Sequence, residues 1–204
     1  MNKENIVEEK HDYHGSKMGM WMFLFTELLL FTGLFLLYSR FRSRYSMEFH
    51  AASTELNKTI GILNTAILLT SSLTMALSIN AIKEGKKNLS IMFQRLTIFL
   101  ALFFLVNKYF EWSSKIHHGI YPNSPELLER GNGKTIFFGL YYLLTGIHGL
   151  HVIAGIILIA IMMLLTKKDL INKEAFIKLE NTGLYWHLVD IIWVYLFPVF
   201  YLIS

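Results

Sequence analysis

Five long apolar runs alternate with short polar segments along the 204-residue chain. The runs cover about residues 18–38, 60–82, 91–110, 135–166 and 182–203. As a helix, each run is long enough to cross a hydrocarbon core about 30 Å thick. The pattern therefore predicts an all-α integral membrane protein, in which a bundle of five transmembrane helices over residues 17–204 follows a polar tail at residues 1–16.

The composition agrees with a membrane protein. Hydrophobic residues make up 53% of the chain and charged residues 17%, against about 25% charged residues in an ordinary soluble domain. Cysteine is absent, which excludes disulfides, thiolate metal sites and iron–sulfur clusters. The net charge of +4 does not indicate nucleic-acid binding, because the Lys and Arg residues lie at the ends of the apolar runs.

The distribution of basic residues predicts an orientation. Lys and Arg are more numerous in the segments that face the cytoplasm if the N-terminus does, which favours a cytoplasmic N-terminus and an outside C-terminus. The basic run RFRSRY at residues 40–45 argues for the opposite orientation. Residues 1–16 lack the basic start and cleavage site of a signal peptide, so we expect the first run to remain as a membrane anchor.

Several ionisable side chains lie inside the apolar runs, where they are costly and mark a functional or packing interior. Glu27 stands alone in the first run and could relay a proton or, as a neutral acid, donate one interhelical hydrogen bond. Lys108 and Glu111 share one face of the third helix, and Lys115 continues that ladder. These residues could reach the membrane surface or pair inside the bundle. The small and hydroxyl residues between 61 and 78 predict close helix packing.

The fourth and fifth runs each carry a polar face. His148 and His151 are three residues apart on one face of the fourth helix, and Glu180, His187 and Asp190 share a face of the fifth. We interpret the two faces as halves of one interhelical polar contact. Three glycines of the fourth run would permit the close approach that such a contact needs: Gly146, Gly149 and Gly155.

A haem or a metal is the other interpretation of these histidines. A two-histidine haem needs one imidazole from each of two facing helices, which His148 or His151 could supply together with His187. A carboxylate di-iron centre needs Glu-x-x-His on two helices, and the chain has no such repeat. Zinc needs three or four converging ligands, which no segment arranges. We therefore expect no metal and no catalytic residue in this chain.

Four stretches together resemble subunit III of the haem–copper terminal oxidases, the cytochrome c oxidase family. They are KMGMWMFLFTELLLFTGLF, ILNTAILLTSS, YYLLTGIHGLHVIAG and YWHLVDIIWVYLF, which follow the family's order on the first, second, fourth and fifth runs. With KYFEW on the third run, the resemblance involves all five. It implies the short five-helix bacterial form, which lacks the two N-terminal helices of the longer form.

The resemblance implies an accessory, non-redox subunit of a proton-pumping oxidase that reduces O2 in the bacterial cytoplasmic membrane. Such a subunit packs on subunit I, in a complex with subunits II and IV, and has no cofactor of its own. Haem and copper are expected in the partner subunits, which would also receive electrons from cytochrome c or quinol. The subunit would bind phospholipid in a cleft between its helices and support proton uptake and stability during turnover. In the longer form, the two helices missing here make one wall of that cleft.

The candidate functional residues form two sets, a polar network and a group of lipid contacts. The expected proton or polar network comprises Glu27, Lys108, Glu111, His148, His151, Glu180, His187 and Asp190. The expected lipid contacts are Lys17, Trp21 and Trp186.

Other functions remain open from the sequence. Within the family, the chain could be subunit III of a quinol oxidase or a relative associated with nitric oxide reductase. Outside the family, it could be an independent b-type haem membrane protein. A small-molecule transporter would call for discontinuous helices and internal repeats, which are not visible.

Overall fold

The computed structural model describes residues 3–202 and the side chains of residues 15–202. Within this range, five helical spans are long and apolar enough to cross a membrane. Their helices are α1 (Lys3–Arg44), α3 (Lys58–Lys83), α4 (Lys87–His117), α6 (Asn132–Lys167) and α7 (Ile177–Phe197), the last continued by the π-helical turn η1 (Pro198–Leu202). The predicted fold class and the order of the spans are confirmed. Helix α1 begins at Lys3, so most of the expected polar tail continues the first membrane helix.

Two connections contain short helices, α2 (Ser46–Thr54) and α5 (Pro125–Glu129). Local sequence explains where the neighbouring helices begin. The Asn57 side chain accepts hydrogen bonds from the first backbone amides of α3 at 3.0 and 3.3 Å, and Ser124 caps α5 in the same way. Gly85 adopts a positive φ of 77° in the tight turn between α3 and α4, a conformation that glycine adopts without strain.

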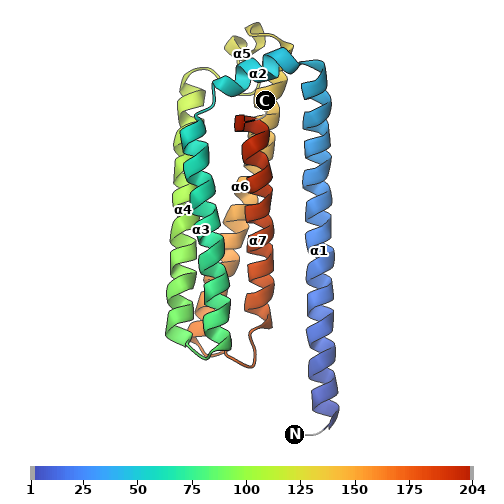
Figure 1. Cartoon of the computed structure of the whole chain (residues 1–204), viewed down its shortest axis with the longest axis vertical. Coiled ribbons are helices and arrows are strands. Elements are labelled where there is room, and N and C mark those ends of the chain that lie inside the picture. Colours follow the sequence, from blue (N-terminus) through green and yellow to red (C-terminus); the bar gives the residue numbers. More distant parts are fainter. Residues whose placement is uncertain (1–2, 203–204) are drawn as a thin grey trace.

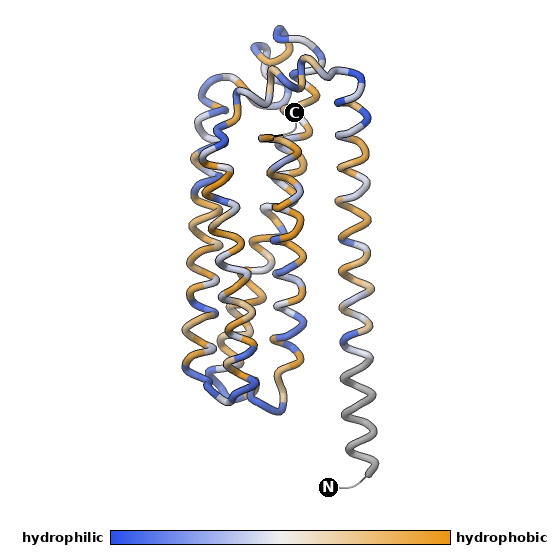
Figure 2. Tube along the Cα trace, in the orientation of Figure 1, coloured by the Kyte–Doolittle hydropathy of each residue, from blue (hydrophilic) through white to orange (hydrophobic). Residues whose placement is uncertain are grey.

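The long helices form one bundle, with α1 at its edge (Figure 1). Helices α3 and α4 are neighbours, α6 packs on α4 and α7, and α1 contacts α6 and α7. The start of α1 and the α3–α4 and α6–α7 turns lie at one end of the bundle, here called the N-terminal end. Helices α2 and α5 lie at the other, the C-terminal end. Hydrophobic residues dominate the middle of the helices and hydrophilic residues gather at both ends, as expected for membrane-spanning helices (Figure 2).

The stripe of small and hydroxyl residues on α3 packs as the sequence predicts. Towards α4, the Asn107 amide donates to the Asn64 carbonyl oxygen at 2.9 Å, and the Thr74 hydroxyl meets the Thr97 hydroxyl at 2.7 Å. Towards α7, the ring of Phe197 lies so close to Gly61 that an added Cβ would be 2.6 Å from it. Helix α3 therefore joins its two neighbours through small side chains and interhelical hydrogen bonds.

An aromatic cluster fixes the C-terminal end of the chain against the bundle. The Tyr38 hydroxyl of α1 donates to the backbone carbonyl of Val199 at 2.8 Å. The ring of Phe200 meets the rings of Phe137 and Tyr141 edge-on, with centroids 5.6 and 5.5 Å apart. These contacts hold η1 inside the bundle. Tyr201, the residue after Phe200, therefore projects towards α4.

Candidate functional site

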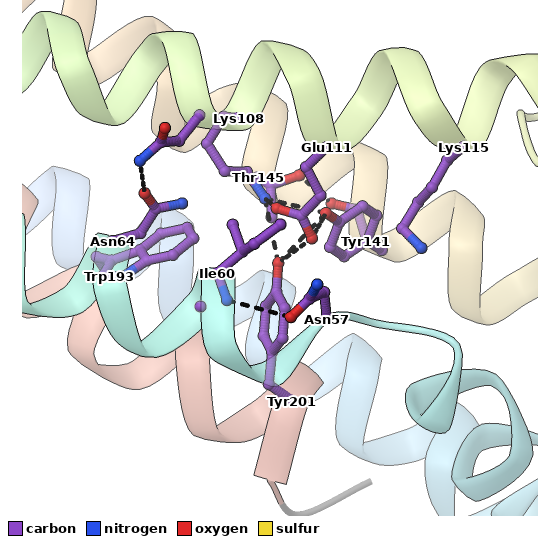
Figure 3. A network of polar contacts seen from close by, with 12 residues as sticks. Asn57, Ile60, Asn64, Lys108, Glu111, Lys115, Tyr141, Thr145, Trp193 and Tyr201 are labelled. Carbon is purple, nitrogen blue, oxygen red and sulfur yellow. Dashed lines mark hydrogen bonds and ion pairs between the residues drawn. The ribbon is translucent and has the colours of Figure 1, made fainter.

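Lys108 and Glu111 form an ion pair inside the bundle. Lys108 Nζ lies 2.9 Å from Glu111 Oε2, and the two side chains are 9% and 4% exposed. One helical turn apart on α4, both point towards α6 and the end of the chain (Figure 3). Of the two arrangements that the sequence allows, the structure has the buried pair. Lys115 extends away from it, because its ammonium donates to the backbone carbonyl of Glu55 at 3.2 Å.

Two phenols complete this site. The Lys108 ammonium donates to the hydroxyls of Tyr141 and Tyr201 at 2.9 and 3.3 Å. Both hydroxyls in turn donate to Glu111 Oε1, at 2.9 and 2.5 Å (Figure 3). The ammonium also faces the ring of Trp193, whose centroid is 5.3 Å away. We call Lys108, Glu111, Tyr141 and Tyr201 the Lys108–Glu111 network.

The network links three separate parts of the chain, α4, α6 and η1. Its two charges cancel, and both are compensated by hydrogen bonds, which is the condition under which buried charges are tolerated. Chemically, this arrangement suits a fixed polar link between helices better than a proton carrier, because both carboxylate oxygens already accept hydrogen bonds.

The histidines of α6 do not share one polar contact. His148 is fully buried between the rings of Phe104 and Trp193, with centroids 5.7 and 5.3 Å away. Neither of its ring nitrogens has a hydrogen-bond partner among the described residues. His151 turns instead towards α1, where its Nε2 lies 2.8 Å from Glu27 Oε2.

The Glu27–His151 pair is less deeply buried than the Lys108–Glu111 network. The two side chains are 17% and 18% exposed, at the contact of α1 with α6. Glu27 therefore has a partner, contrary to its isolated position in the sequence. The pair consists of a carboxylate and an imidazole near the surface of the bundle, and two such groups can exchange a proton.

The polar face of α7 turns towards α3 and the N-terminal end, not towards α6. His187 Nδ1 lies 2.6 Å from the Ser72 hydroxyl of α3. Glu180 pairs with Lys17 at 3.0 Å and with Lys83 at 2.9 Å. Asp190 is buried near Ser72, but neither carboxylate oxygen accepts a well-aligned hydrogen bond from the described residues. The expected contact of this face with His148 and His151 is therefore wrong, because its neighbours are Ser72 and Lys83 of α3 and Lys17 of α1.

The three expected lipid contacts lie in different surroundings. Trp21 is 61% exposed on the outer face of α1, where an integral subunit meets lipid or another chain. Lys17 is bound to Glu180 near the membrane surface. Trp186 is fully buried, and its indole N–H donates to Ser71 at 3.1 Å. The expectation of a lipid contact is therefore wrong for Trp186, because it packs into the interface between α3, α6 and α7.

The glycines of α6 serve different neighbours. At Gly155, an added Cβ would lie 2.6 Å from the Trp186 ring, so this glycine permits the close approach of α7 that the sequence predicts. At Gly146 an added Cβ would lie 3.3 Å from the Trp112 ring of α4. At Gly149 an added Cβ would meet nothing within 4 Å, because this glycine lines an apolar groove of about 490 Å³ between α4 and α6. The expected close approach of a neighbouring helix is therefore wrong for Gly149.

The intramembrane imidazoles do not offer a facing pair for a haem. His148 lies in an aromatic slot, His151 is bound to Glu27 and His187 to Ser72. In the described part of the chain, no three His, Asp or Glu side chains come together as metal ligands.

Comparison with known proteins decides the class. The family model described as "Cytochrome c oxidase subunit III" matches residues 3–204. The chain belongs to this family. It is a membrane subunit III of a haem–copper oxidase of the respiratory chain, and the independent haem protein and the transporter are superseded.

Three relatives illustrate the range of the family. The chain is 30% identical to "Cytochrome c oxidase subunit 3" of Alkalihalophilus pseudofirmus, covering 92% of this chain and 86% of the relative. It is 28% identical to "Probable quinol oxidase subunit 3" of Staphylococcus saprophyticus, covering 98% and 94%. It is also 27% identical to "Heme-copper oxidase subunit I+III" of Aeropyrum pernix, where the match covers 92% of this chain but 22% of the longer relative.

Sequence reasoning missed Tyr141 as a member of the Lys108–Glu111 network, and it also missed Tyr201. The signal for Tyr201 was present: a buried Lys-x-x-Glu pair leaves a carboxylate oxygen free, and a phenol near the end of the fifth span can supply the missing donor. The approach of Tyr201 depends on the π-helical turn after Pro198, which the sequence did not predict. The partner of Glu27 was missed because the sequence does not show how α1 packs against α6.

Proposed function

We propose that the chain is a non-catalytic subunit that packs on subunit I of its oxidase, while haem and copper are held by partner subunits. The buried charges of the bundle carry this proposal. Lys108 and Glu111 neutralise each other and both bind two phenols, so the polar atoms that could bind a substrate already have partners within the bundle. The fused relative of Aeropyrum pernix, which is named as subunit I and III in one chain, supports association with subunit I.

In this proposal the chain helps the oxidase take up protons and stay active over many turnovers. The Glu27–His151 pair is the group suited to proton traffic, since a carboxylate and an imidazole in hydrogen-bond contact can pass a proton between them. Phospholipid bound to the subunit would hold it against its partners. Subunits II and IV complete the complex. The proposed membrane is the bacterial cytoplasmic membrane, with the N-terminal end of the bundle in the cytoplasm.

The proposal is tested with the oxidase purified with and without this chain. We expect both preparations to show the same haem spectrum, and we expect an initial rate of O2 consumption that is modestly lower without the chain because proton uptake is slower. The preparation without the chain should lose activity after fewer turnovers. Loss of the haem signal, or an initial rate near zero, would show that the chain belongs to the catalytic machinery.

A quinol oxidase is a second candidate for the complex. The chain is 28% identical to a relative named as a quinol oxidase subunit and 30% identical to one named as a cytochrome c oxidase subunit, so identity does not separate the two donors. Oxygen consumption by the purified complex, with reduced cytochrome c or with a quinol as donor, distinguishes them. Activity with quinol alone would favour the quinol oxidase.

A further inference from the structure

A basic pocket lies at the N-terminal end of the bundle, between the start of α4 and the end of α6. It has a volume of about 400 Å³ and is lined by Lys87, Asn88, Ile91, Met92, Arg95 and Lys167. The two helices run in opposite directions here, so the first turns of α4 meet the last turn of α6 (Figure 1). Helix α1, which carries the expected lipid contacts Lys17 and Trp21, contributes no residue to this pocket.

The pocket has an excess of positive charge. The Lys87 ammonium is occupied, because it binds Asp169 at 2.6 Å and the backbone carbonyl of Lys167 at 2.9 Å. Arg95 and the Lys167 side chain are exposed and form no ion pair with any described side chain. Three cations therefore face one carboxylate, and two of the cations remain available to an anion.

The position of Arg95 explains which kind of anion fits. At a helix rise of about 1.5 Å per residue, α4 is about 46 Å long and extends beyond a hydrocarbon core of about 30 Å by about 8 Å at each end. Arg95 lies about 12 Å along α4 from Lys87, so its Cα lies at the edge of that core. Its neighbours on the same face are apolar and exposed, with Met92 52% and Phe99 64% accessible. An arginine among lipid-facing side chains extends towards the interface and needs a counter-charge there. The counter-charge must therefore lie at the depth of the lipid headgroups.

We propose that this pocket binds the phosphate of an anionic phospholipid such as phosphatidylglycerol. Arg95 and Lys167 hold the phosphate, and the acyl chains lie along the exposed apolar stripe formed by Met92, Leu96 and Phe99. Basic pockets between transmembrane helices at the cytoplasmic surface are suited to such headgroups. The inference deepens the lipid-binding part of the proposed function, but it needs no oxidase activity.

The test is a lipid titration of the full chain, purified with the subunits that accompany it and then delipidated. Native mass spectrometry measures bound phosphatidylglycerol, and phosphatidylcholine with the same acyl chains is the uncharged comparison. We expect the wild-type chain to prefer phosphatidylglycerol. The Arg95→Gln/Lys167→Gln variant should lose that preference, with an apparent affinity lower by on the order of tenfold. Added salt should weaken the wild-type binding, because the attraction is electrostatic.

The matched control is Lys168→Gln/Lys173→Gln, which removes two exposed cations from the same end of the bundle but none from the pocket. It should keep the preference, and so should the charge-conserving Arg95→Lys. Equal losses in control and pocket variants would mean diffuse attraction and would overturn the inference. Equal binding of both lipids would also overturn the inference. A crosslink between Lys167 and a carboxylate of a partner subunit would overturn it as well. The absence of haem subunits from the preparation would contradict the proposed function, not the lipid site.

Discussion

Removing one charge of the Lys108–Glu111 network should destabilise the bundle more than removing both. Lys108→Met leaves the Glu111 carboxylate with the hydrogen bonds from Tyr141 and Tyr201, but without its counter-charge, at a side-chain exposure of 4%. An uncompensated buried charge costs about 3–5 kcal/mol. Lost interhelical hydrogen bonds in a membrane cost only about 0.6–2 kcal/mol. The charge should therefore dominate the loss in Lys108→Met.

The double variant Lys108→Met/Glu111→Gln separates the two effects. It is neutral, and the amide oxygen that replaces the carboxylate can still accept from the phenols, so we expect a loss of only about 1–2 kcal/mol. Glu111→Gln alone should fall between the two variants, because the ring faces around Lys108 still stabilise its ammonium. The assay is unfolding of each variant in mixed micelles with increasing sodium dodecyl sulfate, followed by circular dichroism. Additive losses, with the double variant the least stable, would show that the unpaired charge does not dominate the loss.

Substitutions of single residues probe the helix packing, the Glu27–His151 pair and the outer surface of the bundle. Gly155→Ala places a methyl group 2.6 Å from the Trp186 ring and should lower the free energy of unfolding by about 1–3 kcal/mol in the same assay. Gly149→Ala meets open space and should be neutral or stabilising. Equal effects of the two variants would contradict this packing. Glu27→Ala should leave the complex assembled but shorten its active lifetime during turnover, and an unchanged lifetime would reduce Glu27 to a packing residue. In bilayers with brominated acyl chains, Trp21→Phe should remove most of the quenchable tryptophan fluorescence, while Trp186→Phe should not; the reverse result would place Trp186 at the lipid surface.

The sequence predicted the features that depend on a single helix. Hydropathy alone located the five spans, because a backbone in hydrocarbon must satisfy its own hydrogen bonds as a helix. The spacing of Lys108 and Glu111 also predicted that they share a face, and the structure pairs them. Gly155 was correctly read as a point of close helix approach.

The features that depend on how helices rotate against one another were beyond the sequence. Polar residues on two helices suggested a shared contact, yet His148 faces aromatic rings and His187 faces a serine of α3. The rotation of α7 is set by the tight fit of Trp186 against Gly155 and Ser71, which is a property of three helices together. Tyr201 reaches Glu111 only because η1 follows α7.

Membership of an oxidase complex is tested directly by affinity purification of this chain, tagged at one terminus, from its native membrane in a mild detergent. Larger subunits should be recovered with it, and the reduced-minus-oxidised spectrum of the eluate should show their haem. Recovery of the chain alone, without haem and without a partner, would contradict its role as a subunit of a haem–copper oxidase.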